Sequence, residues 1–240
     1  MLKYNFLLYI LSPFIVLKLI YYSYKNTIKE PYLSKKLFGY KNITERSIWI
    51  HAASLGEMKI AVNVCKQLIK SGYEDIMITS NTISSKVFFD KSEINNIEHY
   101  YLPFDFYLSM KKFVTAINAK LLIVIETEIW PNLYSLCKRN DTRIIIINAR
   151  FNPPNGLLKL LSKNIYNETL KNVDHIYCKS KKDRESYLEY VSAKNLSVDG
   201  NIKHSLVDED LPAENLINRK YVLLASSHHR EEIIIIKEWL

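Results

Sequence analysis

The sequence predicts an α/β protein built on a parallel β-sheet. Short apolar runs alternate with amphipathic segments from residue 47 to about residue 200, which is typical of consecutive βαβ units. Two of the runs, LLIVI (121–125) and RIIIIN (143–148), are apolar without alternation, as expected for strands covered on both faces. Polar and charged residues follow the ends of the runs, where ligands bind in such sheets.

The expected strands are short apolar runs, and the helices between them are longer segments with apolar residues three or four positions apart. Ile60, Val64 and Leu68 show this helical spacing after the first run. The same criteria place strands at residues 47–52, 75–79, 99–103, 121–125, 143–148, 175–178 and 196–200, and helices at 58–71, 82–90, 107–117, 132–139, 156–170 and 181–190.

The end of the chain breaks this alternation. Residues 208–219 are polar and contain Pro212, as a linker would. Residues 220–240 then begin a new strand and a new helix, which are too little to bury a core of their own. They therefore either dock onto the first domain or begin a longer second one.

The N-terminal segment is predicted to be a membrane anchor over residues 1–30. Residues 4–17 are apolar and uncharged, and after Lys18 the run continues to Tyr24. This length suits either a single span or a helix lying in the interface. Tyrosines near its end suit the headgroup zone, and the lysines that follow predict a cytoplasmic location for the rest of the chain. A buried core helix is the alternative.

The composition of the chain favours some classes of binding partner over others. The 240 residues are 48% hydrophobic and 24% charged, with a formal net charge of +8, which favours anionic partners. No basic run stands out, so nucleic acid is not favoured as a partner. Cys65, Cys137 and Cys178 are far apart, and the histidines show no paired metal-ligand spacing. We therefore expect buried reduced thiols and no metal site.

Glu57 has two interpretations. Ser54 and Glu57 form the S-x-x-E pattern of a capping box at a helix start. The same carboxylate stands where the first strand turns into a helix, which suits a general base. The residues alone leave both interpretations open.

Seven segments along the chain resemble one known family. They are IWIHAASLGE (48–57), TSNT (79–82), YYLPFD (100–105), ETEIWPNL (126–133), INAR (147–150), GNIK (200–203) and SSHHREE (226–232). In order and approximate spacing they resemble the 3-deoxy-D-manno-octulosonic acid (Kdo) transferases of lipopolysaccharide assembly. The resemblance implies the N-terminal half of a glycosyltransferase B fold, with a Rossmann-like acceptor-binding domain over residues 31–210. Residues 211–240 would be the linker and the start of a truncated nucleotide-sugar-binding domain.

The resemblance also implies a reaction. The donor would be CMP-Kdo, the acceptor the phosphorylated and acylated lipid A precursor, and the location the cytoplasmic face of the inner membrane. Transfer would proceed with inversion and without a cofactor other than the donor substrate. The positive charge and the predicted anchor fit an anionic acceptor embedded in a membrane.

By the family pattern, Glu57 is the general base that deprotonates the acceptor hydroxyl. Glu126 and Glu128 resemble a second acidic site; in an extended stretch they would point the same way, and we favour Glu126 of the two. Lys203 is the basic residue expected to stabilise the leaving group. Trp130 and Pro131 are expected to shape the loop. The expected substrate-binding positions are Ser54, Gly56, Thr79, Asn81, Thr82, Arg150, Asn201, Ser226, His228 and Glu231.

Two departures from the family pattern matter. Residues 151–155 read FNPPN where the family has a serine- and arginine-bearing stretch, and Arg230 stands where a glycine is expected. Without the glycine-rich loops of a donor domain, the 240 residues are expected to have little or no transfer activity. The alternatives are another glycosyltransferase of the same fold, an inactive or split-gene fragment that binds lipid A precursor without catalysis, and a generic structural domain, which the seven segments disfavour.

Overall fold

The computed structural model describes residues 2–25, 32–40, 42–94, 96–202 and 237. The chain divides into two compact units, Met1–Leu206 and Val207–Leu240, and apart from Lys237 all described residues belong to the first. The linker, strand and helix predicted for residues 208–240 lie outside the described residues.

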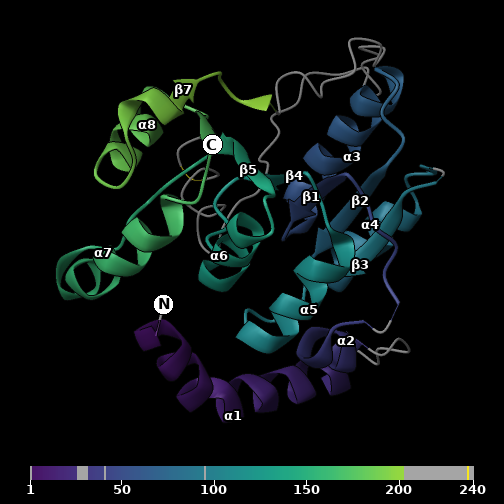
Figure 1. Ribbon diagram of the computed structural model, residues 1–240, viewed down its shortest axis with the longest axis horizontal. Coiled ribbons are helices and arrows are strands. Elements are labelled where there is room, and N and C mark those ends of the chain that lie inside the picture. The colour runs from purple at the N-terminus through teal and green to yellow at the C-terminus, as the bar shows by residue number, and fades with distance from the viewer. Residues whose placement is uncertain (1, 26–31, 41, 95, 203–236, 238–240) are drawn as a thin grey trace. The chain divides into compact units, whose positions relative to one another are not determined.

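Seven parallel strands form a single sheet in the order β3-β2-β1-β4-β5-β6-β7 (Figure 1). The predicted α/β class and parallel sheet are therefore confirmed. The strands are β1 (Ile48–Ala52), β2 (Ile76–Ser80), β3 (Glu98–Tyr101), β4 (Leu121–Ile125), β5 (Arg143–Ala149), β6 (His175–Cys178) and β7 (Leu196–Val198).

The chain covers the two faces of the sheet with different helices. From β1 it moves outward through α3 (Leu55–Lys70) and α4 (Ile83–Asp90) to β3. It then returns through α5 (Tyr107–Ile117) to β4, beside β1, and continues outward in the other direction. Because parallel crossovers are right-handed, this reversal puts α3 and α4 on one face and the later helices on the other. The later helices are α6 (Pro131–Arg139), α7 (Gly156–Leu170) and α8 (Lys181–Leu188).

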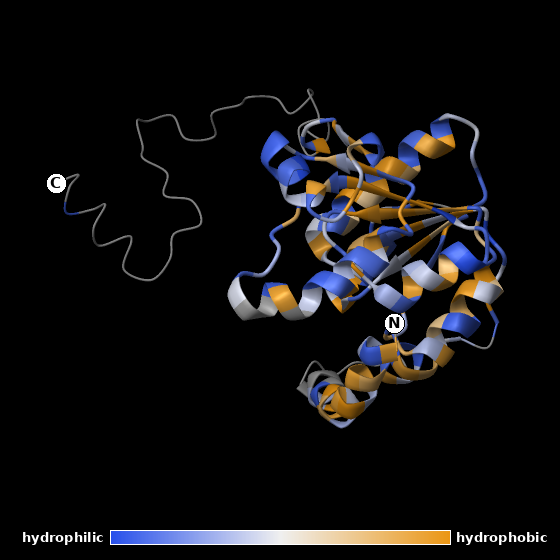
Figure 2. Ribbon diagram, turned by 60° about the vertical axis from the view of Figure 1, so that its left-hand side comes forward, coloured by the Kyte–Doolittle hydropathy of each residue, from blue (hydrophilic) through white to orange (hydrophobic). Residues whose placement is uncertain are grey.

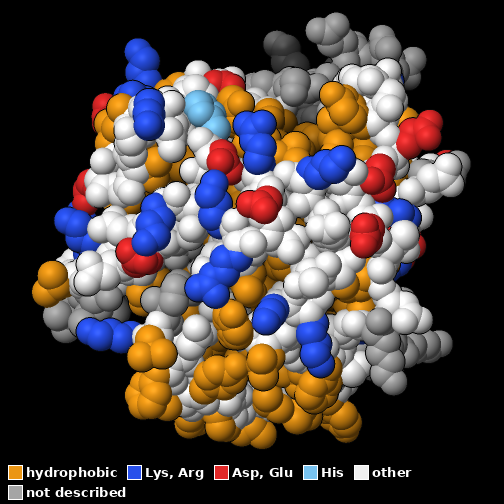
Figure 3. Space-filling view, viewed as in Figure 1, with side chains coloured by type: hydrophobic (Ala, Val, Ile, Leu, Met, Phe, Trp, Pro, Cys, Tyr) orange, Lys and Arg blue, Asp and Glu red, His pale blue; other side chains and the backbone are white. Residues whose placement is uncertain are grey.

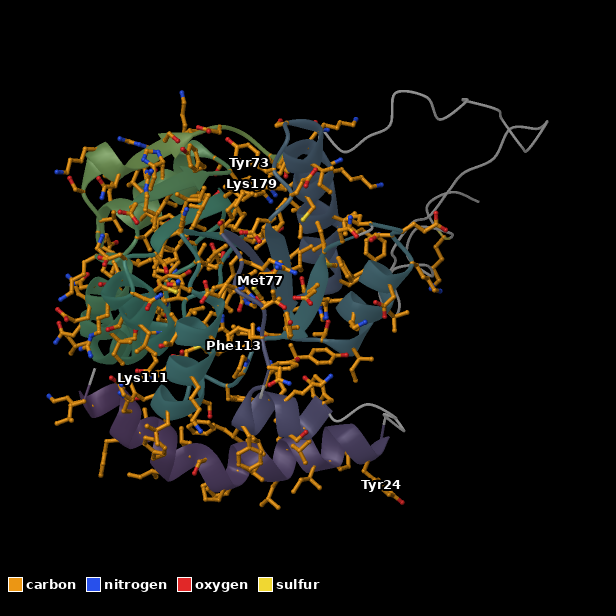
Figure 4. All side chains as sticks on the ribbon, turned by 45° about the vertical axis from the view of Figure 1, so that its right-hand side comes forward. Tyr24, Tyr73, Met77, Lys111, Phe113 and Lys179 are labelled. Atoms are coloured by element: carbon orange, nitrogen blue, oxygen red, sulfur yellow. The ribbon has the colours of Figure 1, made fainter. Side chains whose placement is uncertain are left out.

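Each face has its own apolar core. On one side, Trp49 and Met77 of the sheet lie in a cluster with Phe113 of α5, and Figure 4 labels Met77 and Phe113. On the other, Ile50 lies in a cluster with Met58 of α3. The strands lie between the two clusters, and in Figure 2 they are the orange, hydrophobic segments at the centre of the domain. Burial on both faces explains the unbroken apolar runs of the sequence.

The predicted elements agree with the structure to within a few residues. The helix α3 begins earlier than predicted, because Ser54 is its N-cap residue. The strand β3 ends at Tyr101, shortly before Pro103, which has no N–H for a ladder. The short helices α2 (Tyr32–Phe38) and η1 (Ala193–Asn195) were not predicted.

The N-terminal segment forms the helix α1 (Leu2–Lys25). Its apolar side chains are mostly exposed, including Phe6 at 69% and Phe14 at 70%, so it is not a buried core helix. Tyr4 anchors it to the domain by donating a hydrogen bond to Asp105 Oδ2 at 2.9 Å. Among the described residues, no helix has the length and apolar character needed to span a membrane.

Candidate active site

The candidate active site lies where the order of the strands reverses, between β1 and β4. Here the chain leaves the two neighbouring strands toward opposite faces of the sheet, and such switch points open a crevice at the carboxyl ends of the strands. Glu57 follows β1, whereas Glu126 and Glu128 follow β4. Glu57 interacts electrostatically with both of the other carboxyl groups. The predicted convergence of these three residues is confirmed.

Glu57 is folded back onto the start of its own helix. Its Oε2 accepts the Ala53 N–H at 2.7 Å, and its Oε1 accepts the Ser54 hydroxyl at 2.8 Å. Ser54 Oγ in turn accepts the Glu57 N–H at 3.4 Å. Ser54 is thus confirmed as the N-cap residue, and Glu57 closes the cap through the Ser54 hydroxyl and the N–H of Ala53, the residue before the N-cap.

The environment of Glu57 also suits proton transfer. The residue is only 9% exposed, and burial raises the pKa of its carboxyl group. The hydrogen bonds from Ser54 and Ala53 act in the opposite direction, and the nearby Glu126 raises the pKa further. A carboxyl group with a raised pKa accepts a proton more readily near neutral pH.

Glu126 has an unusual backbone conformation. Its φ angle is +61°, and that of Asn148 at the end of the neighbouring strand β5 is +51°. Asparagine tolerates this left-handed region better than glutamate does. Asn148 Nδ2 donates to Glu126 Oε1 at 3.3 Å, and the Glu126 N–H donates to Ile147 O at 3.0 Å. Because Glu126 is left-handed, residues 126–128 do not continue the extended strand, so strand alternation is not what directs these two side chains, although both act electrostatically on Glu57.

Glu128 is held by the aromatic residues that follow it. Trp130 Nε1 donates to Glu128 Oε2 at 2.8 Å, and the Tyr134 hydroxyl donates to the Glu128 carbonyl oxygen. Burial and then the charge of Glu57 raise the pKa of Glu128 to about 7. Pro131 is the first residue of α6, where its fixed φ suits a helix start. The expectation that Trp130 and Pro131 shape the loop is confirmed.

Lys36 belongs to this site, although no motif of the sequence pointed to it. It lies on α2, is 4% exposed, and donates to Asn81 Oδ1 and to the Leu102 carbonyl oxygen, both at 2.7 Å. Burial lowers the pKa of Lys36 to about 7, and the attraction of Glu128 opposes that change. In the sequence it was one lysine in a series after the apolar segment, and only the tertiary fold buries it.

The other predicted substrate-binding residues differ in how far their side chains are exposed to solvent. Thr79 is fully buried, so it packs beneath the residues that line the site. Thr82 is the N-cap of α4 and accepts the Ser85 N–H at 3.3 Å. Arg150 is exposed after β5, and no hydrogen bond or ion pair links its guanidinium to the described part of the chain.

Gly56 and Asn201 also lie within the described residues. A Cβ atom at Gly56 would meet only Ser54 Oγ, at 4.0 Å, so the fold itself does not demand glycine there. Asn201 is half-buried shortly after β7. The remaining predicted site residues, Lys203, Ser226, His228 and Glu231, lie outside the described residues.

Neither metal ligands nor reactive thiols were found in the described part of the chain. No group of three or more histidine, cysteine, aspartate or glutamate side chains there could hold a metal ion. Cys65, Cys137 and Cys178 are free and buried, as predicted. Burial raises the pKa of each thiol, to about 12 for Cys65.

Comparison with known proteins relates this arrangement to curated transferases. The 3-deoxy-D-manno-octulosonic acid transferase of Rickettsia felis is 30% identical over 204 residues, covering 79% of this chain and 42% of that protein. The transferase of the same name from Haemophilus influenzae is 30% identical over 257 aligned positions, covering 98% of this chain and 58% of that protein. The chain therefore spans about half the length of the curated relatives it matches.

Among solved structures, a UDP-N-acetylglucosamine 2-epimerase superimposes with a TM-score of 0.50 and 10% identity, over 68% of this chain and 48% of that one. At this identity the likeness supports the Rossmann-like fold alone. The family model described as 3-deoxy-D-manno-octulosonic-acid transferase (kdotransferase) matches residues 30–206. Since that match covers most of the chain, the chain belongs to the 3-deoxy-D-manno-octulosonic-acid transferase family.

Proposed function

We propose that this chain is the acceptor-binding half of an enzyme that transfers Kdo from CMP-Kdo to the lipid A precursor with inversion. The observation that carries the proposal is the meeting of Glu57 with Glu126 and Glu128 at the switch point of the sheet, in a chain of the kdotransferase family. Donor, acceptor and stereochemistry rest on the family resemblance.

Glu57 is the proposed general base. A sugar hydroxyl is a weak nucleophile, and a carboxylate within hydrogen-bond reach can take its proton as the new bond forms. The raised pKa of Glu57 suits this role. A carboxyl group on the facing loop, Glu126 or Glu128, can stabilise positive charge developing on the sugar.

A binding protein without catalysis is the second candidate, and one observation favours it. Both oxygens of Glu57 accept hydrogen bonds from its own helix start, as they would in a purely structural cap. A carboxylate offers about four acceptor sites, so this geometry leaves room for an acceptor hydroxyl. The two candidates therefore require an experiment.

The chain itself offers a matched control for that experiment. At the start of α8, Ser180 is the N-cap, its hydroxyl donates to Asp183 Oδ2 at 2.5 Å, and its Oγ accepts the Asp183 N–H at 3.2 Å. We suggest fusing residues 1–206 to the C-terminal half of the Haemophilus influenzae relative and comparing Glu57→Gln with Asp183→Asn. Each substitution removes one capping carboxylate and keeps its shape.

Loss of transfer by about 100-fold or more in Glu57→Gln, with Asp183→Asn near wild type, is the expected result. Binding of lipid A precursor in micelles by the unfused 240-residue chain should persist in both variants, whereas transfer by that chain alone should stay at background. Equal, small effects of the two substitutions on transfer would show that Glu57 is only a cap. Robust transfer by the unfused chain would contradict the assignment of this chain as one half of the enzyme.

The helix α1 is the proposed membrane-binding element, at the cytoplasmic face of the inner membrane. Its exposed apolar side chains form the orange area along the lower edge of Figure 3, where α1 runs in Figure 1. Beside it, a pocket of about 1200 Å³ between α2 and α5 is lined by Lys35, Lys111 and Lys112. Apolar side chains flanked by lysines are typical of segments that lie on anionic membranes.

Sedimentation with vesicles tests this membrane role. Phe14→Asp on α1 should reduce binding to vesicles that contain anionic lipid. Tyr73→Asp is the control, because Tyr73 is also exposed, at 54%, and lies at the opposite end of the view in Figure 4 from Tyr24 of α1. Equal binding by the two variants would contradict the assignment.

A further inference from the structure

We propose that His51 is a positioning residue of the site: the Thr79 hydroxyl holds His51 Nδ1 as an acceptor, so that its Nε2–H is a fixed, buried donor directed toward the Glu128 carboxyl group. The inference rests on the proposed function and deepens it, since it assigns a role to a residue outside the expected site residues. It also distinguishes Glu128 from Glu126.

The argument begins with three side chains on neighbouring strands. Trp49 and His51 lie on the same face of β1, and Thr79 is the register partner of His51 on β2. All three are fully buried. Trp49 Nε1 lies 2.8 Å from Thr79 Oγ1, and His51 Nδ1 lies 2.9 Å from the same oxygen.

The chemistry of these groups fixes the direction of the Trp49 hydrogen bond, and the tautomer of His51 sets the direction of the other. An indole nitrogen can only donate, so Thr79 Oγ1 accepts from Trp49. The hydroxyl proton of Thr79 is then available for His51 Nδ1, which accepts it if the ring carries its own proton on Nε2. Burial lowers the pKa of His51 to about 3, with a further contribution from the charge of Lys36, so the ring stays neutral and holds one proton.

The other ring nitrogen faces the acidic loop. His51 Nε2 has no hydrogen-bond partner among the described residues, and Glu128 Oε2 is the carboxylate oxygen 4.0 Å from it. A movement of Glu128 by about 1 Å would bring the two atoms to hydrogen-bond distance. The Glu128 side chain is 22% exposed, and its Oε2 also accepts from Trp130 Nε1 at 2.8 Å, so the two donors would share this carboxyl group.

The consequence concerns the charge of Glu128. The buried His51 helps to determine whether this carboxyl group is ionised. A donor to the ionised form of Glu128 favours that form, whereas burial opposes it. The same carboxyl group is acted on by charges from several elements. These are Lys36 on α2 and Glu57 on α3, together with the Trp130 N–H, which donates to the carboxylate.

NMR spectroscopy of the 240-residue chain in mild detergent tests the inference without any substrate. Long-range ¹H–¹⁵N spectra report which ring nitrogen of His51 carries the proton. We expect the Nε2–H form from pH 5 to pH 8, retained in Thr79→Ser, which keeps the hydroxyl, and lost in Thr79→Val, which removes it. An Nδ1–H form or a protonated ring in the unmodified chain would overturn the inference, even if a variant failed to fold.

A second measurement follows the Glu128 side-chain carbon as the pH changes. His51→Phe should move the half-titration of Glu128 upward by about one pH unit, and His51→Gln, whose amide N–H can replace the Nε2–H, should restore much of it. An unchanged Glu128 titration in His51→Phe would overturn the positioning role. Because no substrate is involved, these outcomes do not depend on whether the chain takes part in sugar transfer.

Discussion

Replacing Asp105 with alanine should destabilise the domain through the loop that carries the acidic residues. Asp105 is 1% exposed. Its Oδ2 accepts the Asn132 N–H at 2.8 Å and its Oδ1 accepts the Leu133 N–H at 2.9 Å. These are N–H groups of the first turn of α6, which directly follows Glu126 and Glu128. The Tyr4 hydroxyl of α1 is the third donor, at 2.9 Å.

The expected loss can be worked from these contacts. Each buried N–H left without an acceptor costs about 1–3 kcal/mol, which gives about 2–6 kcal/mol for the two. The Tyr4 hydroxyl is only partly buried and can turn to water. Removing a buried carboxyl group also relieves its own desolvation, so we expect the lower half of the range, about 2–4 kcal/mol, at pH 5.

The pH dependence has a definite sign. Burial raises the pKa of Asp105 to about 7, and the N–H groups that donate to it only partly oppose this. Between about pH 4 and pH 7 the native carboxyl group holds a proton that the unfolded chain has released, so its contribution to stability falls as the pH rises. The alanine variant lacks this group. The difference in stability between wild type and variant should therefore be larger at pH 5 than at pH 8.

Urea unfolding followed by tryptophan fluorescence at pH 5, 6.5 and 8 measures these differences. Asp105→Asn keeps one acceptor oxygen and has no titrating group, so its loss relative to wild type should be smaller but should also be larger at pH 5 than at pH 8. The exposed Asp199 provides the surface control, because Asp199→Ala should change stability by less than about 0.5 kcal/mol. A loss below about 1 kcal/mol for Asp105→Ala at every pH, or one that grows with pH, would refute the reasoning.

Three further predictions concern the core, a buried histidine and the cap of α3. Leu133→Ala, at a fully buried position, should cost about 2–5 kcal/mol in urea unfolding, and Leu108→Ala, 67% exposed, less than about 0.5 kcal/mol. Burial lowers the pKa of His99 to about 3, so the unfolded chain binds a proton first as the pH falls below about 6.5. Wild type should therefore lose stability relative to His99→Gln between pH 6.5 and pH 3, and parallel curves would contradict this. Ser54→Ala removes a donor to the Glu57 carboxylate and should raise the pKa of Glu57 in a ¹³C titration; a fall would be inconsistent with the observed hydrogen bond.

Much of the fold could be predicted because its determinants are local. The helix α5 and the strand β4 have the predicted bounds, since amphipathic spacing and continuous apolar runs identify such segments directly. The order of the strands could not be predicted in the same way. It depends on where the chain reverses direction across the sheet, between β3 and β4, and no short pattern records that choice.

The candidate site could be predicted in part, for a related reason. Residues after strand ends meet at one edge of a parallel sheet, which is why Glu57 and Glu126 could be placed together. The burial of Lys36 depends on how α2 packs on the domain, and the left-handed backbone of Glu126 depends on its contacts with β5. Both arise from tertiary structure, which the local sequence does not reveal.

The capping and catalytic interpretations of Glu57 are compatible because of the residue that caps it. A hydroxyl rotates freely and can either donate or accept, whereas a backbone N–H can only donate. Ser54 now donates to the Glu57 carboxylate, and on the proposed mechanism the same hydroxyl can turn to accept a hydrogen bond from Glu57 once that carboxyl group has taken the proton of the acceptor. A base held in place before the substrate arrives needs no reorganisation during the reaction. An aspartate would cap the helix as well as serine does, but its charge would oppose the ionised form of Glu57, and so a neutral cap able to reverse its hydrogen bond suits a helix whose first turn carries the proposed base.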